Sequence, residues 1–345
     1  MKALIKIEPG EGFELTNVEE PKIINSDDVK IRVLRASVCG TDVHIYEWNK
    51  WAEDRIKTPQ IGGHEFVGEV VEVGPEVKNL KKGDIVSGET HIPCKVCYQC
   101  KTGKMHVCKD MEILGVDRDG VFAEYTVVPE IVLWKIDESI PLKYASVMEP
   151  LGNAIHTATA TDLRGKIVLI TGAGPIGAMA IEIAKISGAA AVIVSEISDY
   201  RIKMAKDMGA DLVINPAETD LHAEIAKFTD GHGIDVLLEM SGSVKALNDG
   251  IIALTNGGFA SILGVYNDNE IPFVMNTAVF KNITIQTITG RKMFETWHIA
   301  SQLLKYKKID LEKVVTHELD LKDYKKAFEL MMSGKSGKII LKIAD

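Results

Sequence analysis

Four of the five cysteines in this chain of 345 residues lie within one short segment. They are Cys94, Cys97, Cys100 and Cys108, with the spacing C-x2-C-x2-C-x7-C. Thiolates suit a tetrahedral zinc ion, and short gaps let one loop carry several of them. This spacing predicts a closed zinc site, which stabilises its loop and leaves no open position for a substrate.

Two other uses of clustered cysteines are weaker explanations. Disulfides need an oxidising compartment, and the N-terminal MKALIKIEPG has the pattern of a strand and turn without the apolar core of a secretory signal. Ferredoxin-type iron–sulfur runs have a shorter last gap and a following proline, whereas Lys109 follows Cys108. We therefore expect a cytoplasmic protein with reduced thiols, and we favour zinc over an iron–sulfur cluster.

A second set of ligand types is spread along the first part of the chain. Cys39, His64 and Glu65 provide one thiol, one imidazole and one carboxylate, the kind of set that holds a catalytic zinc with an open position. Each of these residues alone is better explained by ordinary packing or exposure. Glycines 62, 63 and 68 indicate a backbone that passes close to other atoms near His64. A further carboxylate, Glu149, precedes Pro150.

A dinucleotide-binding pattern begins at residue 166. Gly172, Gly174 and Gly177 fit G-x-G-x-x-G after an apolar strand at 167–171, and a helix is expected at 175–187. A second strand at 192–196 ends in Glu196, which could accept hydrogen bonds from the adenosine ribose. The glycines allow the turn and the approach of the pyrophosphate to the helix N-terminus.

Further strand-like runs follow at 212–215, 235–239, 259–264 and 283–288, and helical segments such as 200–208 and 245–254 separate most of them. Six strands in alternation with helices predict a doubly wound parallel sheet, the Rossmann arrangement. After a helix at 295–306, the last strand at 338–343 is expected to return to the first domain. The length favours two domains.

The charge and the hydropathy pattern argue against nucleic-acid binding and against a membrane span. The net charge of −9 argues against nucleic acid, because binding to it depends on clustered Lys and Arg. The most apolar region, 167–195, is interrupted by glycines and charged residues, so no membrane span is expected.

These motifs together resemble the zinc-containing medium-chain alcohol dehydrogenases over the whole chain. Five segments are similar to the threonine-oxidising branch: CGTDVHIYEWNKWA, GETHIPC, EPLGNAIHTA, ITGAGPIG and TGRKMFETW. The resemblance implies an α/β protein with a GroES-like, mainly-β, zinc-binding catalytic domain at residues 1–153 and 294–345. It also implies a Rossmann NAD-binding domain at 154–293, two zinc ions per subunit and a homotetramer. The reaction it implies is oxidation of L-threonine to L-2-amino-3-oxobutanoate with NAD.

The resemblance also implies roles for individual residues. Cys39, His64 and Glu65 would hold the catalytic zinc, and the four clustered cysteines the structural one. Thr41 and His44 would relay the hydroxyl proton to solvent, while Glu149 would bind the catalytic zinc or serve that relay. His91 or a backbone amide could meet the substrate carboxylate. The implied cofactor contacts are Gly172, Gly174, Ile176, Gly177, Glu196, Arg201, Leu263, Gly264, Val265, Ile288 and Thr289.

Two alternatives stay open at this point. A polyol or secondary-alcohol dehydrogenase, of the sorbitol or butanediol type, would share the same zinc and cofactor motifs. A non-catalytic protein that binds zinc and NAD is a remoter possibility, because it would have no use for the Thr41–His44 relay.

Overall fold

The computed structural model describes residues 1–344, and the chain divides into two compact units. Unit 1 contains residues 1–150, 291–307 and those from 315 onward, and unit 2 contains 151–290 and 308–314. The sequence suggested domain boundaries after residues 153 and 293. In the structure the chain passes from one unit to the other after residues 150 and 290, three residues earlier in each case. The short segment 308–314, expected in the first domain, belongs to unit 2.

Unit 1 is built on a seven-stranded mixed sheet with the order β10-β6-β5-β3-β18-β17, in which β9 also pairs with β3. A three-stranded sheet, β2-β1-β4, and a two-stranded ribbon, β7-β8, complete the unit. The strands are β1 (Lys2–Lys6), β2 (Glu14–Asn17), β3 (Asp28–Ser37), β4 (Gln60–Ile61), β5 (Glu65–Val73), β6 (Ile85–Gly88), β7 (His91–Ile92), β8 (Glu112–Ile113), β9 (Tyr125–Pro129), β10 (Leu133–Lys135), β17 (Val315–Asp320) and β18 (Lys338–Lys342).

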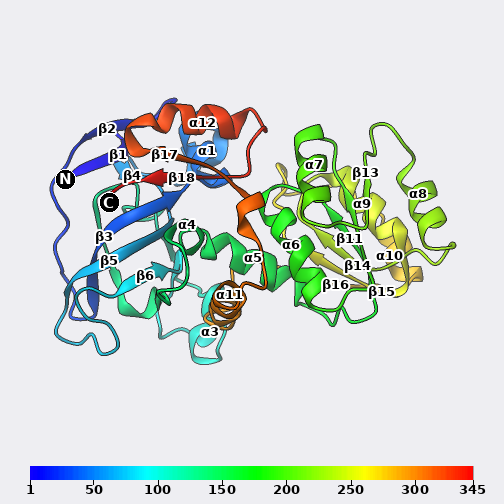
Figure 1. Ribbon diagram of the computed structural model, residues 1–345, viewed down its shortest axis with the longest axis horizontal. Coiled ribbons are helices and arrows are strands. Elements are labelled where there is room, and N and C mark those ends of the chain that lie inside the picture. The colour runs from blue at the N-terminus through cyan, green and yellow to red at the C-terminus, as the bar shows by residue number, and fades with distance from the viewer. Residues whose placement is uncertain (345) are drawn as a thin grey trace. The chain divides into compact units, whose positions relative to one another are not determined.

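The last strand lies in the interior of this sheet. β18 pairs antiparallel with β3 and parallel with β17, so the red strand lies beside the blue one in Figure 1. This confirms the predicted return of the chain to the first domain. Short helices surround the sheets: α1 (Gly40–Glu47), α2 (Lys50–Arg55), α3 (Tyr98–Lys101), α4 (Leu142–Ala145), α11 (Glu295–Lys305) and α12 (Tyr324–Met332).

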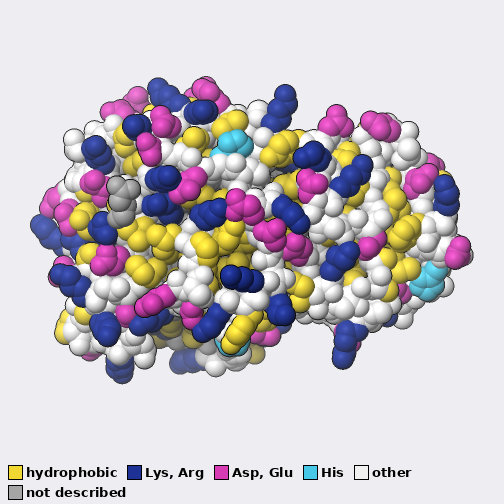
Figure 2. All heavy atoms as spheres, in the orientation of Figure 1, with side chains coloured by type: hydrophobic (Ala, Val, Ile, Leu, Met, Phe, Trp, Pro, Cys, Tyr) yellow, Lys and Arg dark blue, Asp and Glu magenta, His cyan; other side chains and the backbone are white. Residues whose placement is uncertain are grey.

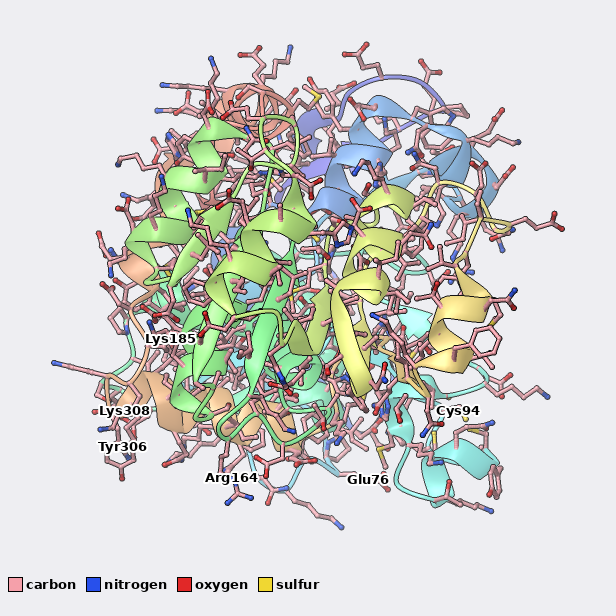
Figure 3. All side chains as sticks on the ribbon, turned by 90° about the vertical axis from the view of Figure 1, so that its right-hand side faces the viewer. Glu76, Cys94, Arg164, Lys185, Tyr306 and Lys308 are labelled. Atoms are coloured by element: carbon pink, nitrogen blue, oxygen red, sulfur yellow. The ribbon has the colours of Figure 1, made fainter. Side chains whose placement is uncertain are left out.

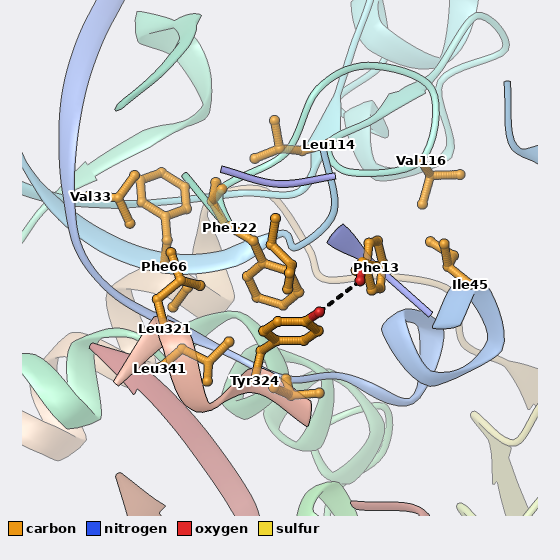
Figure 4. Packing of buried hydrophobic residues seen from close by; sticks show 14 of the residues in the cluster. Phe13, Val33, Ile45, Phe66, Leu114, Val116, Phe122, Leu321, Tyr324 and Leu341 are labelled. Atoms are coloured by element: carbon orange, nitrogen blue, oxygen red, sulfur yellow. Dashed lines mark hydrogen bonds between the residues drawn. The ribbon is translucent and has the colours of Figure 1, made fainter. Parts of the chain in front are cut away.

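The core of unit 1 joins segments from both ends of the chain. Phe13 and Phe122 meet edge to face with ring centroids 6.5 Å apart. The hydroxyl of Tyr324, on α12, donates a hydrogen bond of 2.8 Å to the carbonyl of Phe13, marked by the dashed line in Figure 4. Aromatic rings contribute large buried areas to a core, so the C-terminal helix is fixed against N-terminal residues.

Unit 2 has a six-stranded sheet with the order β13-β12-β11-β14-β15-β16, and all its pairings are parallel. This is the predicted doubly wound arrangement. The strands are β11 (Ile167–Thr171), β12 (Ala191–Ser195), β13 (Leu212–Ile214), β14 (Ile234–Glu239), β15 (Leu254–Ile262) and β16 (Thr284–Thr287). The helices are α6 (Pro175–Ile186), α7 (Asp199–Asp207), α8 (Leu221–Phe228), α9 (Val244–Ala253) and α10 (Met275–Phe280), and α5 (Met148–Ala158) precedes them across the boundary.

One strand boundary differs clearly from the sequence prediction. β15 begins at Leu254 rather than at residue 259, because the run Asn256-Gly257-Gly258, which has the composition of a turn, lies within the strand. The pairing with β14 shifts register between Ile234 and Val236, and Gly257 has a φ of +76°. A bulge accommodates extra residues in this way without ending the strand.

The surface carries both signs of charge. On the face shown in Figure 2, basic and acidic side chains are interspersed, and no large area has a single sign. None of the helices within residues 1–344 combines the length and apolar character needed to cross a bilayer.

The glycines around His64 confirm the expected close approach of the backbone. A Cβ atom on Gly63 would lie 2.4 Å from the Phe122 ring, and this residue has a φ of +84°. A Cβ on Gly68 would lie 2.5 Å from the carbonyl oxygen of Arg32. Both positions therefore require glycine, and they fix the backbone that presents His64 and Glu65.

We expect Gly63→Ala to lower the free energy of unfolding by about 2–4 kcal/mol, because left-handed strain adds to the clash with Phe122. Gly83→Ala is the matched control, since Gly83 also has a positive φ of +90° but has open space around it; it should cost about 1–2 kcal/mol. Thermal unfolding of both variants measures the difference. Equal shifts in Tm would show that the Phe122 contact is unimportant.

Candidate metal centre and dinucleotide cleft

The four clustered cysteines form a compact lobe around α3. Their sulfur atoms all lie within 4.8 Å of one another, and the Sγ of Cys97 is 3.5 Å from that of Cys100 and 3.8 Å from that of Cys108. A tetrahedral ion with Zn–S bonds of about 2.3 Å needs sulfurs about 3.8 Å apart. Figure 3 shows the lobe in cyan, with Cys94 labelled. All four thiols are free, so the geometry fits a single ion.

The pKa values of two of these thiols, Cys97 and Cys100, are shifted in opposite directions. Backbone N–H groups of Cys100 and Lys109 lower the pKa of Cys97 to about 6. Burial and the neighbouring thiols of Cys97 and Cys108 raise the pKa of Cys100 to about 12. Closely packed thiols cannot all ionise unless a positive charge joins them, so the lobe is chemically suited to a divalent metal.

The second set of predicted ligands also comes together. One ligand atom each from Cys39, His64 and Glu65 lies within 4.8 Å of the others. Cys39 is the N-cap of α1, and Asp42 at the N3 position accepts a 2.8 Å hydrogen bond from its N–H. The other oxygen of Asp42 accepts from the N–H of Gly63 and lies 3.6 Å from the Nδ1 of His64. Asp42 therefore holds two of the ligand-bearing segments together.

His64 responds strongly to these charges. Burial alone would lower the pKa of His64, but the carboxylate of Asp42 and the thiol of Cys39 outweigh it and raise this pKa to about 10. Its Nδ1 is buried and has no hydrogen-bond partner among the described residues. The same anionic groups would stabilise a metal cation that replaces the proton on this imidazole.

Glu65 is also paired with a lysine from the last strand. Both carboxylate oxygens of Glu65 lie within 2.7 Å of the Nζ of Lys338, and the hydroxyl of Ser37 donates to one of them. Lys338 also donates to the carbonyl of Val38 at 3.1 Å. β18 thus supplies a buried positive charge in contact with Glu65, one of the three candidate metal ligands.

The two residues expected in a proton relay lie on α1. The Oγ1 of half-buried Thr41 is 3.9 Å from the Sγ of Cys39. His44 is exposed, and its Nδ1 accepts a 2.9 Å hydrogen bond from the amide of Asn49. The structure thus places Thr41 beside the candidate ligand Cys39 and leaves His44 in contact with solvent.

Glu149 lies outside the set of three ligands and meets a buried arginine instead. Its Oε1 is 2.6 Å from the Nη1 of Arg291 and accepts a 2.9 Å hydrogen bond from the hydroxyl of Thr90. That hydroxyl also lies 3.4 Å from the backbone carbonyl of His64, which places the ion pair next to the metal ligands. Arg291 is 2% exposed.

A second carboxylate holds the other side of Arg291. Glu89 is completely buried and accepts from both Nε and Nη2 of Arg291, with the Nε contact at 2.8 Å. The indole N–H of Trp297 on α11 donates to the same carboxylate at 2.9 Å. The two carboxylates outweigh the effect of burial and raise the pKa of Arg291, so this side chain stays charged.

His91 is neutral in this surrounding. Burial and the charge of Arg291 lower the pKa of His91 to about 4. The Nη2 of Arg291 lies 3.3 Å from its Nδ1, and a guanidinium can only donate. Nδ1 is therefore the acceptor, and the proton of the neutral ring is on Nε2.

Sequence reasoning assigned no role to Asp42, Glu89, Arg291 or Lys338. Asp42 had a readable signal, because an acidic residue at N3 often returns to the N-cap of a helix. Glu89 and Arg291 lie within GETHIPC and TGRKMFETW, which carried only the family resemblance. Lys338 had no signal in its local sequence.

In unit 2, several of the predicted cofactor residues line one cleft of about 340 Å³. They are Gly172, Gly174, Glu196 and Arg201. A Cβ on Gly177 would lie 2.0 Å from the carbonyl oxygen of Gly172, whereas the space at Gly174 is open. The first and third glycines thus close the turn, and the second leaves room at the N-terminus of α6.

Glu196 fixes the glycine-rich turn as well as the edge of the cleft. Its carboxylate accepts hydrogen bonds from the N–H groups of Ala173 at 2.7 Å and of Ile197 and Ser198 at 2.9 Å. Arg201 has a buried Nε with no hydrogen-bond partner among the described residues. Lys245, which the sequence did not point to, also lines the cleft.

Most of the other predicted cofactor residues do not line this cleft but follow strands of the same sheet. Ile176 is in the first turn of α6. Leu263 and Gly264 follow β15 and donate their N–H groups to the carbonyl of Glu239, and Val265 is 90% exposed. Ile288 and Thr289 follow β16. Carboxyl ends of parallel strands are where doubly wound sheets bind nucleotides.

Two family models match the chain. Residues 25–138 match the alcohol dehydrogenase GroES-like domain, and residues 175–306 match the zinc-binding dehydrogenase domain. The chain is 52% identical to an L-threonine 3-dehydrogenase of Pyrococcus horikoshii over 341 residues, which cover 99% of this chain and 98% of that protein. It is 46% identical to the protein of that name from Bacillus licheniformis over 343 residues, with the same coverage.

Solved structures of similar fold have lower identity. An alcohol dehydrogenase from Thermus sp. ATN1 superposes with a TM-score of 0.92 at 27% identity, with full coverage of both chains. The 2R,3R-butanediol dehydrogenase from Bacillus subtilis gives a TM-score of 0.89 at 29% identity, with 99% of each chain covered.

Loss of one lobe cysteine should remove one metal site. We expect Cys100→Ser to bind one zinc ion fewer per subunit than the unaltered protein and to melt about 5–10 °C lower, as a loss of about 2–3 kcal/mol implies for a domain of this size. His106→Gln is the matched control, because His106 lies in the same lobe but outside the set of four. Metal analysis and thermal melting measure both effects. Unchanged zinc content in Cys100→Ser would disprove the site.

His91 should make the protein sensitive to acid. Its folded-state pKa of about 4 lies below the ordinary histidine value of about 6.5, so the unfolded chain binds the proton first and stability falls as the pH drops from about 6.5 to 4. Over this pH range the free energy of unfolding of His91→Gln should fall by up to about 3 kcal/mol less than that of the unaltered protein. The exposed His298→Gln is the control. Unfolding experiments at several pH values test this, and parallel curves for all three proteins would contradict it.

Proposed function

Since this chain belongs to the zinc-containing medium-chain alcohol dehydrogenase family, we propose that it catalyses the reaction of the L-threonine 3-dehydrogenases. It oxidises the β-hydroxyl of L-threonine and yields L-2-amino-3-oxobutanoate, with NAD as the hydride acceptor. Identity of about half over nearly the full length of relatives of that name supports this assignment.

The metal ligands of the reaction are Cys39, His64 and Glu65. Their donor set of sulfur, nitrogen and oxygen fits zinc and leaves a position for substrate. A zinc ion there would supply Lewis-acid chemistry, which lowers the pKa of an alcohol. Asp42 and Lys338 hold the ligands in place, and the Cys94, Cys97, Cys100 and Cys108 lobe takes the second, structural zinc.

Selectivity for an amino acid comes from the Arg291–Glu149 pair, and this observation carries the proposal. Threonine brings an ammonium and a carboxylate, and each needs an opposite charge in a buried site. Glu149 offers a carboxylate to the ammonium, and Arg291 offers a guanidinium to the carboxylate. His91 is neutral and can add only the N–H at Nε2.

The substrate hydroxyl proton leaves through α1. Thr41 lies next to Cys39 and can accept and donate through its hydroxyl. His44 is exposed, so its imidazole can exchange the proton with water. The Asn49 amide fixes the ring by occupying Nδ1, which leaves Nε2 for the exchange.

NAD binds along the carboxyl ends of the sheet in unit 2. Gly172, Gly174, Ile176 and Gly177 accommodate the pyrophosphate at α6, and Glu196 accepts from the adenosine ribose. Arg201 flanks that ribose. The segments Leu263–Val265 and Ile288–Thr289 contact the nicotinamide end.

Association into a homotetramer and a cytoplasmic location complete the proposal. β16 is an edge strand of its sheet, and apolar side chains of the neighbouring α10 are strongly exposed, with Phe280 at 85% and Val279 at 62%. Such surfaces favour burial against another chain. All five cysteines are free thiols, and a cytoplasmic location would keep them reduced.

A secondary-alcohol dehydrogenase is the competing function, since the butanediol dehydrogenase of Bacillus subtilis has a closely similar fold. An uncharged diol has no charged group for Glu149 or Arg291 to bind. The buried charges of these two residues therefore argue against such a substrate. A non-catalytic role is disfavoured because Thr41 and His44 both stand on the helix that begins at the metal ligand Cys39.

The substrate is tested by NADH production from threonine, 2-butanol, 2,3-butanediol and sorbitol at matched concentrations. We expect kcat/KM for threonine to exceed that for each alcohol by at least about 100-fold, because the alcohols lack the ammonium and carboxylate that Glu149 and Arg291 would bind. Removal of metal by a chelator should abolish turnover of all four. A preference for sorbitol or butanediol would refute the substrate and leave the dehydrogenase assignment intact.

The cofactor is tested by comparing NAD with NADP. The fixed negative charge of Glu196 should repel a 2′-phosphate, so we expect kcat/KM with NAD to be at least about tenfold higher. Glu196→Gln removes the charge and keeps one of the two oxygen acceptors, which can still serve the N–H groups of Ile197 and Ser198, so it should narrow the ratio of NAD to NADP use. Equal use of both cofactors by the unaltered enzyme would mean that Arg201 and Lys245 outweigh Glu196.

A further inference from the structure

Glu89 is a buried carboxylate to which the proposed mechanism gives no direct part. It follows β6 and is completely shielded from solvent. Its oxygens accept from the Nε and Nη2 of Arg291, from the indole N–H of Trp297 at 2.9 Å and from the backbone N–H of His91 at 3.0 Å. A carboxylate offers about four acceptor positions, so Glu89 has none left for a substrate or a metal.

The geometry of these contacts fixes the orientation of Arg291. Two parallel N–H donors on one carboxylate hold the guanidinium in a plane, as an arginine fork does. The remaining nitrogen, Nη1, is then directed at Glu149, 2.6 Å away. The edge bound by Glu89 also brings Nη2 within 3.3 Å of the Nδ1 of His91. The Glu89 carboxylate therefore determines which nitrogens of Arg291 face Glu149 and His91.

Glu89 also limits how tightly Arg291 can hold Glu149. A lone arginine beside a lone carboxylate forms a two-point pair, and such a pair would occupy both groups that must meet the substrate. Because Glu89 already uses two nitrogens of the fork, Arg291 offers Glu149 a single one. The burial of Glu89 is offset by Arg291 itself, which, against the effect of burial, holds the pKa of Glu89 below its usual range.

We propose that Glu89 is a positioning residue that sets selectivity for an amino acid over a plain secondary alcohol by holding Arg291 and His91 in place. The inference rests on the proposed function, because it assumes that Arg291 and Glu149 meet the carboxylate and ammonium of threonine. Trp297 contributes to the same positioning, since its indole N–H donates to the Glu89 oxygen that also accepts from the Nε of Arg291.

The test compares threonine with 2-butanol, which reaches the metal but carries neither charge. Glu89→Gln puts an amide donor against the donors of Arg291. We expect KM for threonine to rise at least tenfold, with kcat/KM for 2-butanol within threefold of the unaltered enzyme. Trp297→Phe keeps the Glu89–Arg291 pair and should lower the threonine-to-butanol ratio by about threefold. If Glu89→Gln gives no folded protein, the threonine-to-butanol ratio measured for Trp297→Phe decides the test.

Two controls separate positioning from a general structural role. Glu69→Gln weakens another glutamate–arginine pair of the same unit, the partly exposed pair of Glu69 with Arg32 at 3.0 Å on β5 and β3, and it should leave the ratio unchanged. The double variant Glu89→Gln with Arg291→Lys should be no worse on threonine than Arg291→Lys alone, because Glu89 acts through Arg291. Zinc content and Tm are measured for every variant.

Equal losses on both substrates, or additive effects in the double variant, would overturn the inference. An unchanged ratio in Glu89→Gln, with threonine activity in the unaltered enzyme, would overturn it and leave the proposed function intact. If the unaltered enzyme does not oxidise threonine, both the proposed function and this inference are refuted.

Discussion

The cost of burying charge is the constraint that organises unit 1. Asp42, His64, Glu65, Glu89, Glu149, Arg291 and Lys338 are all nearly or fully shielded from water. An unpaired charge in such surroundings is very unfavourable, so each must have a partner of opposite sign or a cation. The sheet order, the return of the last strand and the segment after Gly290 all bring these partners together. Removing one partner typically costs about 3–5 kcal/mol, and the cluster therefore ties the fold to the site.

The parts of the protein that the sequence predicted best are local. The glycine-rich turn, its strand and helix, and Glu196 lie within one stretch of the chain, and their order alone specifies the structure. The four lobe cysteines could be predicted for the same reason. They all lie between Cys94 and Cys108, so one loop can bring them together. In β15, by contrast, the local composition at Asn256-Gly257-Gly258 favoured a turn, and pairing with β14 kept the strand continuous through a bulge.

The substrate side of the site could not be predicted in the same way. Glu89 and Arg291 are separated by 202 residues, and each is an ordinary charged residue in its own neighbourhood. Only the folded chain shows that both are buried and that Glu149 lies at the other end of the guanidinium. The sequence could suggest that His91 meets a carboxylate, but its neutral state depends on Arg291, which is a property of the assembled site.

The position of β18 has a consequence for the order in which the protein is made. Lys338 neutralises Glu65, which precedes it by 273 residues. At about 5–20 residues per second, a ribosome would expose Cys39, His64 and Glu65 for about 14–55 seconds before this lysine is synthesised. Until β18 inserts between β3 and β17, the Glu65 carboxylate has no lysine to balance its charge on burial. The segment that holds Cys39, His64 and Glu65 can therefore reach its final packing only after the last strand has been synthesised.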